Sequence, residues 1–224
     1  MNVCVVIPAF NEEKSIGHVI DSLRRNRYER IVIVDDGSVD RTAAIAERKG
    51  ATVLVHPINR GQGAALATGT QYAVNEGADV VVHFDADGQM RAEDIASLVK
   101  PLELGKAEVA FGSRFLKKQS NIPWLRRLFL RLGRIFMRVL YGVQMSDPQS
   151  GFRAMTASAA RKIEITQRGM AHCSEIIEEV HRKNIPFIEV PVVIKYTDYS
   201  LQHGQSNLAA FRIAARLLWR KLVR

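Results

Sequence analysis

Short runs of β-branched and other apolar residues alternate with segments of helical periodicity along the first half of the chain. The runs predict strands at Val3–Ile7, Arg30–Asp35, Thr52–His56, Val80–Phe84 and Glu108–Gly112. The segments between them predict helices near Glu13–Arg25, Thr42–Lys49, Gly63–Glu76 and Ala92–Leu104. Nearly continuous apolar strands that alternate with helices are typical of a mostly parallel sheet with helices on both faces. We therefore expect an α/β sandwich.

The pattern changes after Gly112. The rest of the chain predicts two basic helical stretches at Trp124–Tyr141 and Asn207–Val223, a loop at Ser146–Gly151, a helix near Ser174–Lys183 and a β-rich run at Pro186–Tyr196. A length of 224 residues fits one domain. We expect a single domain over residues 1–206, which includes the helix at about 124–141, followed by a basic amphipathic helix at 207–224.

The net charge of +9 arises in two segments rather than along the whole chain. Eight Lys and Arg residues and no acid lie between Arg114 and Ser146, and five and no acid lie between Tyr199 and Arg224. A nucleic-acid-binding module is a competing interpretation of this charge. However, aromatic residues make up only 7% of the chain, and the basic residues follow helix faces instead of alternating with stacking rings. We expect no nucleic-acid partner.

Both basic segments are amphipathic. In the first, arginines lie opposite an apolar stripe, with Arg127, Arg131, Arg134 and Arg138 facing away from Leu125, Leu128, Leu132 and Ile135. Such a helix suits a membrane interface, and the alternative is an apolar face packed on the protein's own core. No run of 18 residues lacks a charge, so no membrane span is predicted. We expect a peripheral protein at a membrane surface, with a small membrane-anchor protein left open as an additional partner.

The two cysteines, Cys4 and Cys173, are far apart and belong to no cluster of metal-ligand spacing. This usage gives no disulfide framework and fits a reducing, cytoplasmic setting. Together with the basic helices, it predicts a location at the cytoplasmic face of the membrane.

Two carboxylates stand at the end of the fourth predicted strand. Asp85 and Asp87 are two residues apart, and Gln89 offers a third oxygen. Ligands of open α/β sheets bind outside the carboxyl ends of the strands. Carboxylates in that position can hold Mg²⁺ or Mn²⁺ while leaving coordination positions open for diphosphate oxygens. The alternative is a polar turn closed by Gly88.

Polar residues also follow the second and third predicted strands. Asp35-Asp36 resembles groups that accept hydrogen bonds from a nucleoside, although a turn before a helix N-cap is the alternative. Arg60 and Gly61 precede a helix, where they could meet phosphate charge or form only a flexible helix start. No G-x-G-x-x-G follows the first strand and no G-x-x-x-x-G-K-[ST] occurs, so we expect side chains to bind any nucleotide.

Asp147 lies in the aperiodic segment Ser146–Arg153. It is a candidate general base or positioning carboxylate, and the alternative is a surface turn. His172 and Cys173 have no partner at a spacing typical of metal ligands or of a catalytic pair, so we expect both to pack in the interior.

Six segments, in this order, closely resemble the motifs of inverting glycosyltransferases of family 2, which have the GT-A fold: PAFNEE (8–13), VDDGSVDRT (34–42), NRGQGAAL (59–66), DADGQ (85–89), GSRF (112–115) and SDPQSGFR (146–153). Within that family the chain is most similar to the dolichol-phosphate mannose synthase group, and the resemblance covers about residues 3–206. It implies a GT-A fold, a GDP- or UDP-linked sugar as donor, a polyprenyl phosphate as acceptor, and Mg²⁺ or Mn²⁺.

The resemblance also implies roles for individual residues. It assigns donor contacts to Pro8, Phe10, Glu12, Asp36, Gly61, Asp85 and Ala86, and metal ligation to Asp85, Asp87 and Gln89. It assigns catalytic roles to Asp87, Arg114 and Asp147, and contact with the acceptor phosphate to Arg126 and Arg127. The group often has a basic residue after a Gly-x-Ser in its C-terminal active-site loop. Here Asn207 follows Ser206, which leaves His203 as the substitute candidate.

The implied reaction is a single in-line displacement at the anomeric carbon, with the nucleoside diphosphate as leaving group. A phosphate acceptor is already ionised at neutral pH, whereas a hydroxyl acceptor needs a general base. The alternative is therefore transfer to a glycan hydroxyl in polysaccharide or cell-envelope synthesis, with Asp147 as the base. A catalytically silent relative that serves as a scaffold fits the intact Asp85-x-Asp87 pair less well.

Overall fold

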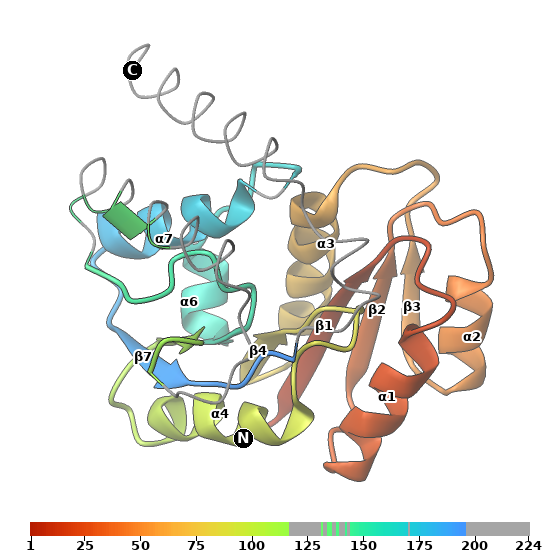
Figure 1. Cartoon of the computed structure of the whole chain (residues 1–224), viewed down its shortest axis with the longest axis horizontal. Coiled ribbons are helices and arrows are strands. Elements are labelled where there is room, and N and C mark those ends of the chain that lie inside the picture. The colour runs from red at the N-terminus through yellow and green to blue at the C-terminus, as the bar shows by residue number, and fades with distance from the viewer. Residues whose placement is uncertain are drawn as a thin grey trace.

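The computed structural model describes residues 1–116, 131, 134–135, 138, 142, 144–169 and 171–195. Within this part of the chain, seven strands form one sheet in the order β3-β2-β1-β4-β6-β5-β7 (Figure 1). The strands are β1 (Val3–Ala9), β2 (Ile31–Asp35), β3 (Thr52–Val55), β4 (Val80–His83), β5 (Val109–Ser113), β6 (Arg153–Thr156) and β7 (Phe187–Pro191). β6 runs antiparallel to β4 and β5, and the other pairs are parallel. The expected α/β fold with a mostly parallel sheet is confirmed.

Helices cover both faces of the sheet (Figure 1). One face carries α1 (Ile16–Arg25), α2 (Thr42–Arg48), the short 3-10 helix η1 (Ala92–Asp94) and α4 (Ile95–Glu103). The other carries α3 (Gln62–Asn75), α6 (Ala157–Lys162) and α7 (His172–Arg182). Alternate residues of β1 point to opposite faces, so Val5 packs under α1 while Val6 packs under α3. The interior therefore consists of two apolar layers, one on each side of the sheet.

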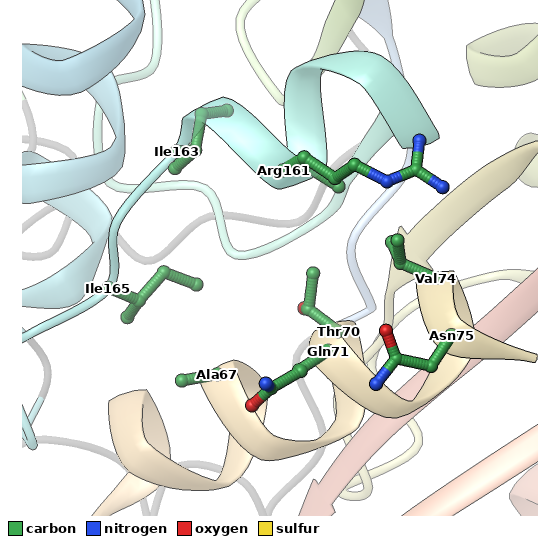
Figure 2. A pocket seen from close by; sticks show the side chains of 9 residues that line it. Ala67, Thr70, Gln71, Val74, Asn75, Arg161, Ile163 and Ile165 are labelled. Atoms are coloured by element: carbon green, nitrogen blue, oxygen red, sulfur yellow. The ribbon is translucent and has the colours of Figure 1, made fainter.

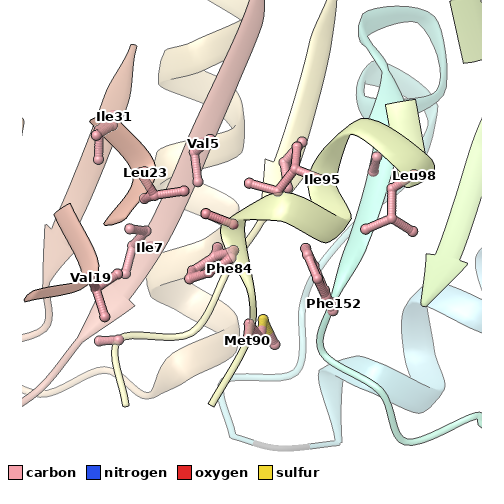
Figure 3. Close-up of a cluster of buried hydrophobic side chains, with 14 of the residues drawn as sticks. Val5, Ile7, Val19, Leu23, Ile31, Phe84, Met90, Ile95, Leu98 and Phe152 are labelled. Atoms are coloured by element: carbon pink, nitrogen blue, oxygen red, sulfur yellow. The ribbon is translucent and has the colours of Figure 1, made fainter. Parts of the chain in front are cut away.

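The layer under α1 and α4 reaches the carboxyl end of β4 (Figure 3). Phe84 and Phe152 pack edge to face there, with ring centroids 5.4 Å apart. Phe84 directly precedes Asp85, and Phe152 ends the loop that leads into β6. This apolar contact in the core places the Asp85 segment next to the loop that leads into β6.

The sequence pattern does not predict β6 or α6. β6 begins with the fully buried Arg153 and ends with Thr156, so it lacks the continuous apolar run of a core strand. The described part of the β-rich run Pro186–Tyr196, which ends at Lys195, is strand only in β7, and Ile194 forms an isolated bridge with Met90. The strands and helices predicted up to Gly112, and the helix predicted near Ser174–Lys183, are present with ends that differ by a few residues.

Most of the two basic segments lies outside the described residues, and so does the whole of Asn207–Val223. Four described residues of the first segment, Arg131, Arg134, Ile135 and Arg138, are α-helical. Ile135 belongs to the predicted apolar stripe, yet it is 56% exposed. Among the described residues, no helix combines the length and the apolar character that a membrane span requires.

Helix α3 approaches the sheet closely at Gly69. A Cβ at this position would lie 2.4 Å from Cγ1 of Val6 and 2.9 Å from Cγ2 of Val34, distances that real side chains do not tolerate. Gly17 in α1 differs, because a Cβ there would meet Ile45 at an ordinary 3.4 Å. Close packing therefore requires a glycine at position 69, whereas at position 17 a glycine only lowers the helix propensity.

We expect Gly69→Ala to lower the free energy of unfolding by about 1–3 kcal/mol, because the added methyl group overpacks the contact between α3 and β1. Gly17→Ala is the matched control and should leave the free energy unchanged or raise it by up to about 1 kcal/mol, through better helix propensity. Urea denaturation followed by circular dichroism measures both. Equal stability of the two variants would contradict the proposed close approach.

Candidate active site

The polar segments of the sequence converge at one edge of the sheet. Asp35 ends β2, Asp85 follows β4 by one residue, and Arg114 directly follows β5. These are the carboxyl ends of strands that run parallel to one another, so their side chains emerge at the same edge. β6 enters from this edge, which brings the Asp147 loop to it as well.

Asp36 organises the loop that precedes α3. Its carboxylate accepts hydrogen bonds from the main-chain N–H groups of Arg60 (3.0 Å) and Gly61 (2.6 Å), and His56 Nδ1 lies 2.6 Å from Asp36 Oδ1. His56 Nε2 in turn lies 3.0 Å from the hydroxyl of Thr68 in α3. Asp36 is 3% exposed and makes internal contacts, while its direct contact with a nucleoside stays a prediction. Sequence reasoning missed His56, since a single histidine after a strand carries no signal.

Glycines at the start of α3 allow a second loop to lie against it. Gly61 has a φ of +94°, and a Cβ there would lie 2.3 Å from the carbonyl oxygen of Arg168. The N–H of Gly63 donates to that same carbonyl at 2.8 Å. Between them, Gln62 donates from Nε2 to Asp85 Oδ1 at 3.1 Å. The helix start is therefore held against Asp85, which gives Gln62 a role that the sequence did not indicate.

Asp85 and Asp87 are both half-buried at the end of β4. Burial and then the nearby Asp87 carboxylate raise the pKa of Asp85 to about 7, so two negative charges here are unfavourable without a compensating cation. The main-chain N–H of Gln89 donates to Asp87 Oδ1 at 3.0 Å and its side-chain Nε2 to Oδ2 at 2.7 Å. Gln89 thus orients Asp87 through N–H groups. The methyl group of Ala86 packs in the core, so its main chain is the part left for a donor contact.

These residues fit a divalent cation as a partial set of ligands. Among the described residues, no group of three His, Cys, Asp or Glu side chains could hold a metal ion. A cation on Asp85 and Asp87 would take its other oxygens from water or from a ligand, which is how Mg²⁺ is commonly bound. The arrangement is suited to an ion that arrives with an anionic substrate.

The first residue of β6 is a buried arginine, Arg153. It lies opposite His83 in the neighbouring strand β4, and its Nη2 donates a hydrogen bond to Sγ of Cys173 at 3.3 Å. Burial alone would raise the pKa of the Cys173 thiol, but the charges of His172 and Arg153 outweigh it and lower the pKa to about 6. The interior position expected for His172 and Cys173 is confirmed. Cys173 thus gives the buried guanidinium a hydrogen-bond acceptor inside the core.

Arg114 and Asp147 form a buried, doubly hydrogen-bonded ion pair. Arg114 Nε donates to Asp147 Oδ2 and Nη2 donates to Oδ1, each at 2.6 Å. The main-chain N–H of Arg114 adds a third hydrogen bond to Oδ2 at 3.1 Å. The exposed fraction is 7% for Arg114 and 2% for Asp147. Both carboxylate oxygens of Asp147 are thus engaged by arginine, which suits a positioning carboxylate better than a general base.

The segment after β1 carries the remaining donor candidates. Pro8 is buried within β1, whereas Phe10 is 46% exposed at the edge. Glu12 accepts a hydrogen bond from the Ser15 hydroxyl, and its N–H donates to Thr42 Oγ1 at 2.8 Å. This links the segment to the start of α2 and leaves the Phe10 ring accessible.

The structure therefore brings most of the predicted site residues to one edge. The contacts run from Asp36 to Gly61, and from Gln62 to Asp85. A Cβ on Gly151 would lie 3.2 Å from Asp85 Oδ2, so the loop that carries Asp147 passes beside Asp85. The predicted acceptor residues Arg126, Arg127 and His203 lie outside the described residues.

A cavity of about 350 Å³ lies elsewhere, between α3 and α6 (Figure 2). It is lined by Ala67, Thr70, Gln71, Val74, Asn75, Ala160, Arg161, Ile163 and Ile165. None of these is a predicted site residue, and those that belong to α3 lie more than one turn after Gln62. The cavity is separate from the candidate active site.

The model of the family Glycosyl transferase family 2 matches residues 4–164. The chain belongs to glycosyltransferase family 2. The matched region spans all of β1 but its first residue, β2 to β6, and every predicted site residue that the structure describes. The carboxylates and the arginine described above therefore belong to a nucleotide-sugar-dependent glycosyltransferase.

This family 2 glycosyltransferase has curated relatives of similar length. It is 37% identical to an uncharacterized protein of Methanocaldococcus jannaschii over 98% of this chain and 92% of that protein. It is 34% identical to a UDP-N-acetylglucosamine–dolichyl-phosphate N-acetylglucosaminyltransferase of Methanococcus voltae over 98% of this chain and 96% of that protein. The resemblance expected from the six motifs is confirmed.

A solved structure supports the GT-A fold of this family 2 glycosyltransferase. Glucosyl-3-phosphoglycerate synthase from Mycobacterium tuberculosis, in complex with Mn²⁺, UDP and glucosyl-3-phosphoglycerate, matches with a TM-score of 0.76. The match covers 99% of this chain and 78% of that chain at 20% sequence identity. The expected GT-A fold is confirmed.

We expect Asp36→Asn to lower the free energy of unfolding by about 1–3 kcal/mol. Asparagine has an NH₂ group where aspartate has its second oxygen, so one main-chain N–H of the loop would face another donor and lose its acceptor. The amides of Arg60 and Gly61 should also exchange hydrogen faster. Asp21→Asn is the control, since it removes only the exposed ion pair with Lys49 and should change stability by less than about 1 kcal/mol. Urea denaturation and hydrogen–deuterium exchange measure these effects, and unchanged exchange at Arg60 would contradict the organising role.

Proposed function

We propose that this glycosyltransferase transfers a sugar from a nucleoside-diphosphate sugar, GDP- or UDP-linked, to a polyprenyl phosphate of the dolichyl or undecaprenyl type. The observation that carries the proposal is the Arg114–Asp147 pair. Both carboxylate oxygens of Asp147 already accept hydrogen bonds from Arg114, so Asp147 is better placed to hold the guanidinium than to remove a proton. An acceptor that is already ionised needs no such base.

The Methanococcus voltae relative supports the same acceptor class. Its name states that it acts on dolichyl phosphate, and it is 34% identical to this chain over nearly the full length of both proteins. Its donor is UDP-N-acetylglucosamine by the same name. The proposal for this chain keeps the donor base and the sugar open.

The donor would bind at the carboxyl ends of β1, β2 and β4. Phe10 offers an exposed ring to the base. Further proposed contacts, on the strength of their sequence positions, are Pro8, Glu12, Asp36, Gly61 and Ala86. Asp36 would act largely through the loop at Arg60 and Gly61, whose N–H groups it accepts. Asp85 stands next to that loop through Gln62, so the diphosphate would lie between them.

Mg²⁺ or Mn²⁺ is the proposed cofactor, held by Asp85 and Asp87 with Gln89 as a third candidate ligand. A bound divalent ion would offset the negative charge that develops on the leaving diphosphate. The raised pKa of Asp85 supports this proposal, because a position that disfavours a second negative charge gains stability from a cation. Gln89 holds the Asp87 carboxylate in a fixed orientation for it.

The acceptor phosphate would approach from the Arg114 side. Asp147 holds two N–H groups of the Arg114 guanidinium and thereby fixes its orientation at the end of β5. Arg126, Arg127 and His203 are the further proposed phosphate contacts, on the strength of their sequence positions. A phosphate oxygen would attack the anomeric carbon while the bond from that carbon to the diphosphate oxygen breaks, so the configuration inverts.

The proposed site of action is the cytoplasmic face of a membrane, where a polyprenyl phosphate presents its head group. The two basic amphipathic segments would bind there, with arginines toward anionic lipid head groups. The exposure of Ile135, which belongs to the predicted apolar stripe, supports this proposal. A small membrane-anchor protein would be an additional partner.

We expect donor turnover to require Mg²⁺ or Mn²⁺ and to fall by at least about 100-fold in Asp87→Ala, because removal of a metal ligand costs several kcal/mol of leaving-group stabilisation. The control is Asp79→Ala, an exposed aspartate at the opposite end of β4. Calorimetric titration with Mn²⁺ in the presence of the nucleoside diphosphate gives a readout that is independent of turnover. Full activity in EDTA would contradict the metal proposal.

We expect polyprenyl phosphate to accept the sugar and the corresponding polyprenol to be inert. Arg114→Lys should raise the KM for the lipid phosphate by about tenfold or more and leave the donor KM within about twofold, because lysine keeps the charge but loses the planar fork. Radiolabelled sugar transfer with each acceptor measures this. Efficient transfer to polyprenol or to an oligosaccharide, with lipid phosphate inert, would replace the proposal with the hydroxyl-acceptor alternative.

A further inference from the structure

We propose that Glu189 is the positioning residue that sets the acceptor side of the active site. It acts on Arg114 through the main chain of Ser146 and Asp147 rather than by touching substrate. The proposal deepens the proposed function, on which it rests for the identity of the acceptor. No motif of the sequence included Glu189.

The carboxylate of Glu189 collects the hydrogen-bond donors of the Asp147 loop. Glu189 lies in the middle of β7, opposite Phe111 of β5. Both of its side-chain oxygens lie 2.9 Å from the main-chain nitrogen of Ser146. Oε1 also accepts from the hydroxyl of Ser146 at 2.7 Å and from the N–H of Asp147 at 3.2 Å. One carboxylate therefore holds two consecutive residues of the loop.

A second contact ties the same loop to the end of β5. The hydroxyl oxygens of Ser146 and Ser113 lie 2.5 Å apart, and Ser113 is fully buried. Ser113 directly precedes Arg114, whose main-chain N–H and guanidinium both donate to Asp147. Glu189 thus reaches Arg114 by two routes, one through Asp147 and one through Ser113.

A carboxylate suits this position better than an amide. It offers two acceptor oxygens, whereas glutamine offers one oxygen and two N–H donors. The N–H of Ser146 faces both oxygens of Glu189. A glutamine would place its NH₂ group in one of those two positions, so only part of the hydrogen bonds would remain. The Asp147 carboxylate is already paired with the buried Arg114, so the negative charge of Glu189 lies beside a charge that is compensated.

The segment after Glu189 has its own contact with the donor side. Val193 donates from its N–H to Asp94 Oδ2 at 2.8 Å, and Lys195 donates to the carbonyl of Gln89 at 2.9 Å. These bonds involve main-chain groups beyond β7 and not the Glu189 side chain. Loss of that side chain should therefore disturb the acceptor side selectively.

The test compares steady-state kinetics of Glu189→Ala, Glu189→Gln and Glu108→Ala with the wild type. Glu108 is the control, because it is an acid before β5 that pairs with Lys162 near the opposite edge of the sheet. We expect Glu189→Ala to raise the KM for polyprenyl phosphate by about tenfold or more, since hydrogen bonds to a charged group are lost. The donor KM should stay within about twofold, Glu189→Gln should be intermediate, and Glu108→Ala should match the wild type.

Hydrogen–deuterium exchange gives a second readout that needs no acceptor. In Glu189→Ala the amides of Ser146 and Asp147 should exchange faster, while those of Arg60 and Gly61 stay protected. Unchanged exchange and an unchanged acceptor KM would overturn the proposal, and so would equal losses toward donor and acceptor, which indicate a general structural role. If Glu189→Ala does not fold, Glu189→Gln and Ser146→Ala carry the same test.

The two proposals fail in different ways. If the wild type transfers no sugar to polyprenyl phosphate, the proposed acceptor is wrong, and the exchange measurement still decides the role of Glu189. If the wild type is active and Glu189→Ala behaves like it in both measurements, only the positioning role is wrong.

Discussion

Loops at the carboxyl edge of the sheet carry main-chain N–H groups that no neighbouring strand accepts. Such groups are costly when buried, and here buried or half-buried carboxylates accept them. Asp36 accepts from Arg60 and Gly61, Asp94 from Val193, Glu175 from Thr166 and Gln167, and Glu189 from Ser146 and Asp147. A carboxylate can satisfy several donors at once, so each of these residues holds a loop in one position. The arrangement of the active site depends on this recurring contact.

The loops that precede α3 and that carry Asp147 are held in this way as neighbours. Gln62 brings the start of α3 to Asp85, and Gly151 lets the Asp147 loop pass beside the same carboxylate. The edge-to-face pair of Phe84 and Phe152 supports both segments from the core. Displacement at an anomeric carbon requires two substrates to be aligned closely, and a shared support for the two loops meets that requirement.

Much of the fold could be predicted from the sequence, because apolar runs and helical periodicity indicate directly which residues are buried. The five strands predicted in the first half of the chain are present, since each is nearly continuous in apolar residues. β6 could not be predicted, because it begins with Arg153, and a charged residue does not indicate a buried strand. Arg153 is buried in the fold because other elements, such as α7 with Cys173, contact it. Its antiparallel insertion between β4 and β5 depends on pairing that no local pattern encodes.

The sequence by itself determined the family, the α/β class and the polar residues that follow each strand, because these depend on residue type and order along the chain. Tertiary structure decided how those residues are used. It directs the Asp36 carboxylate to main-chain N–H groups and occupies both Asp147 oxygens with Arg114. It also gives Gln62 and Glu189 roles that no motif indicated. The physical reason is that a carboxylate's function depends on which donors surround it, and here those donors come from distant parts of the chain.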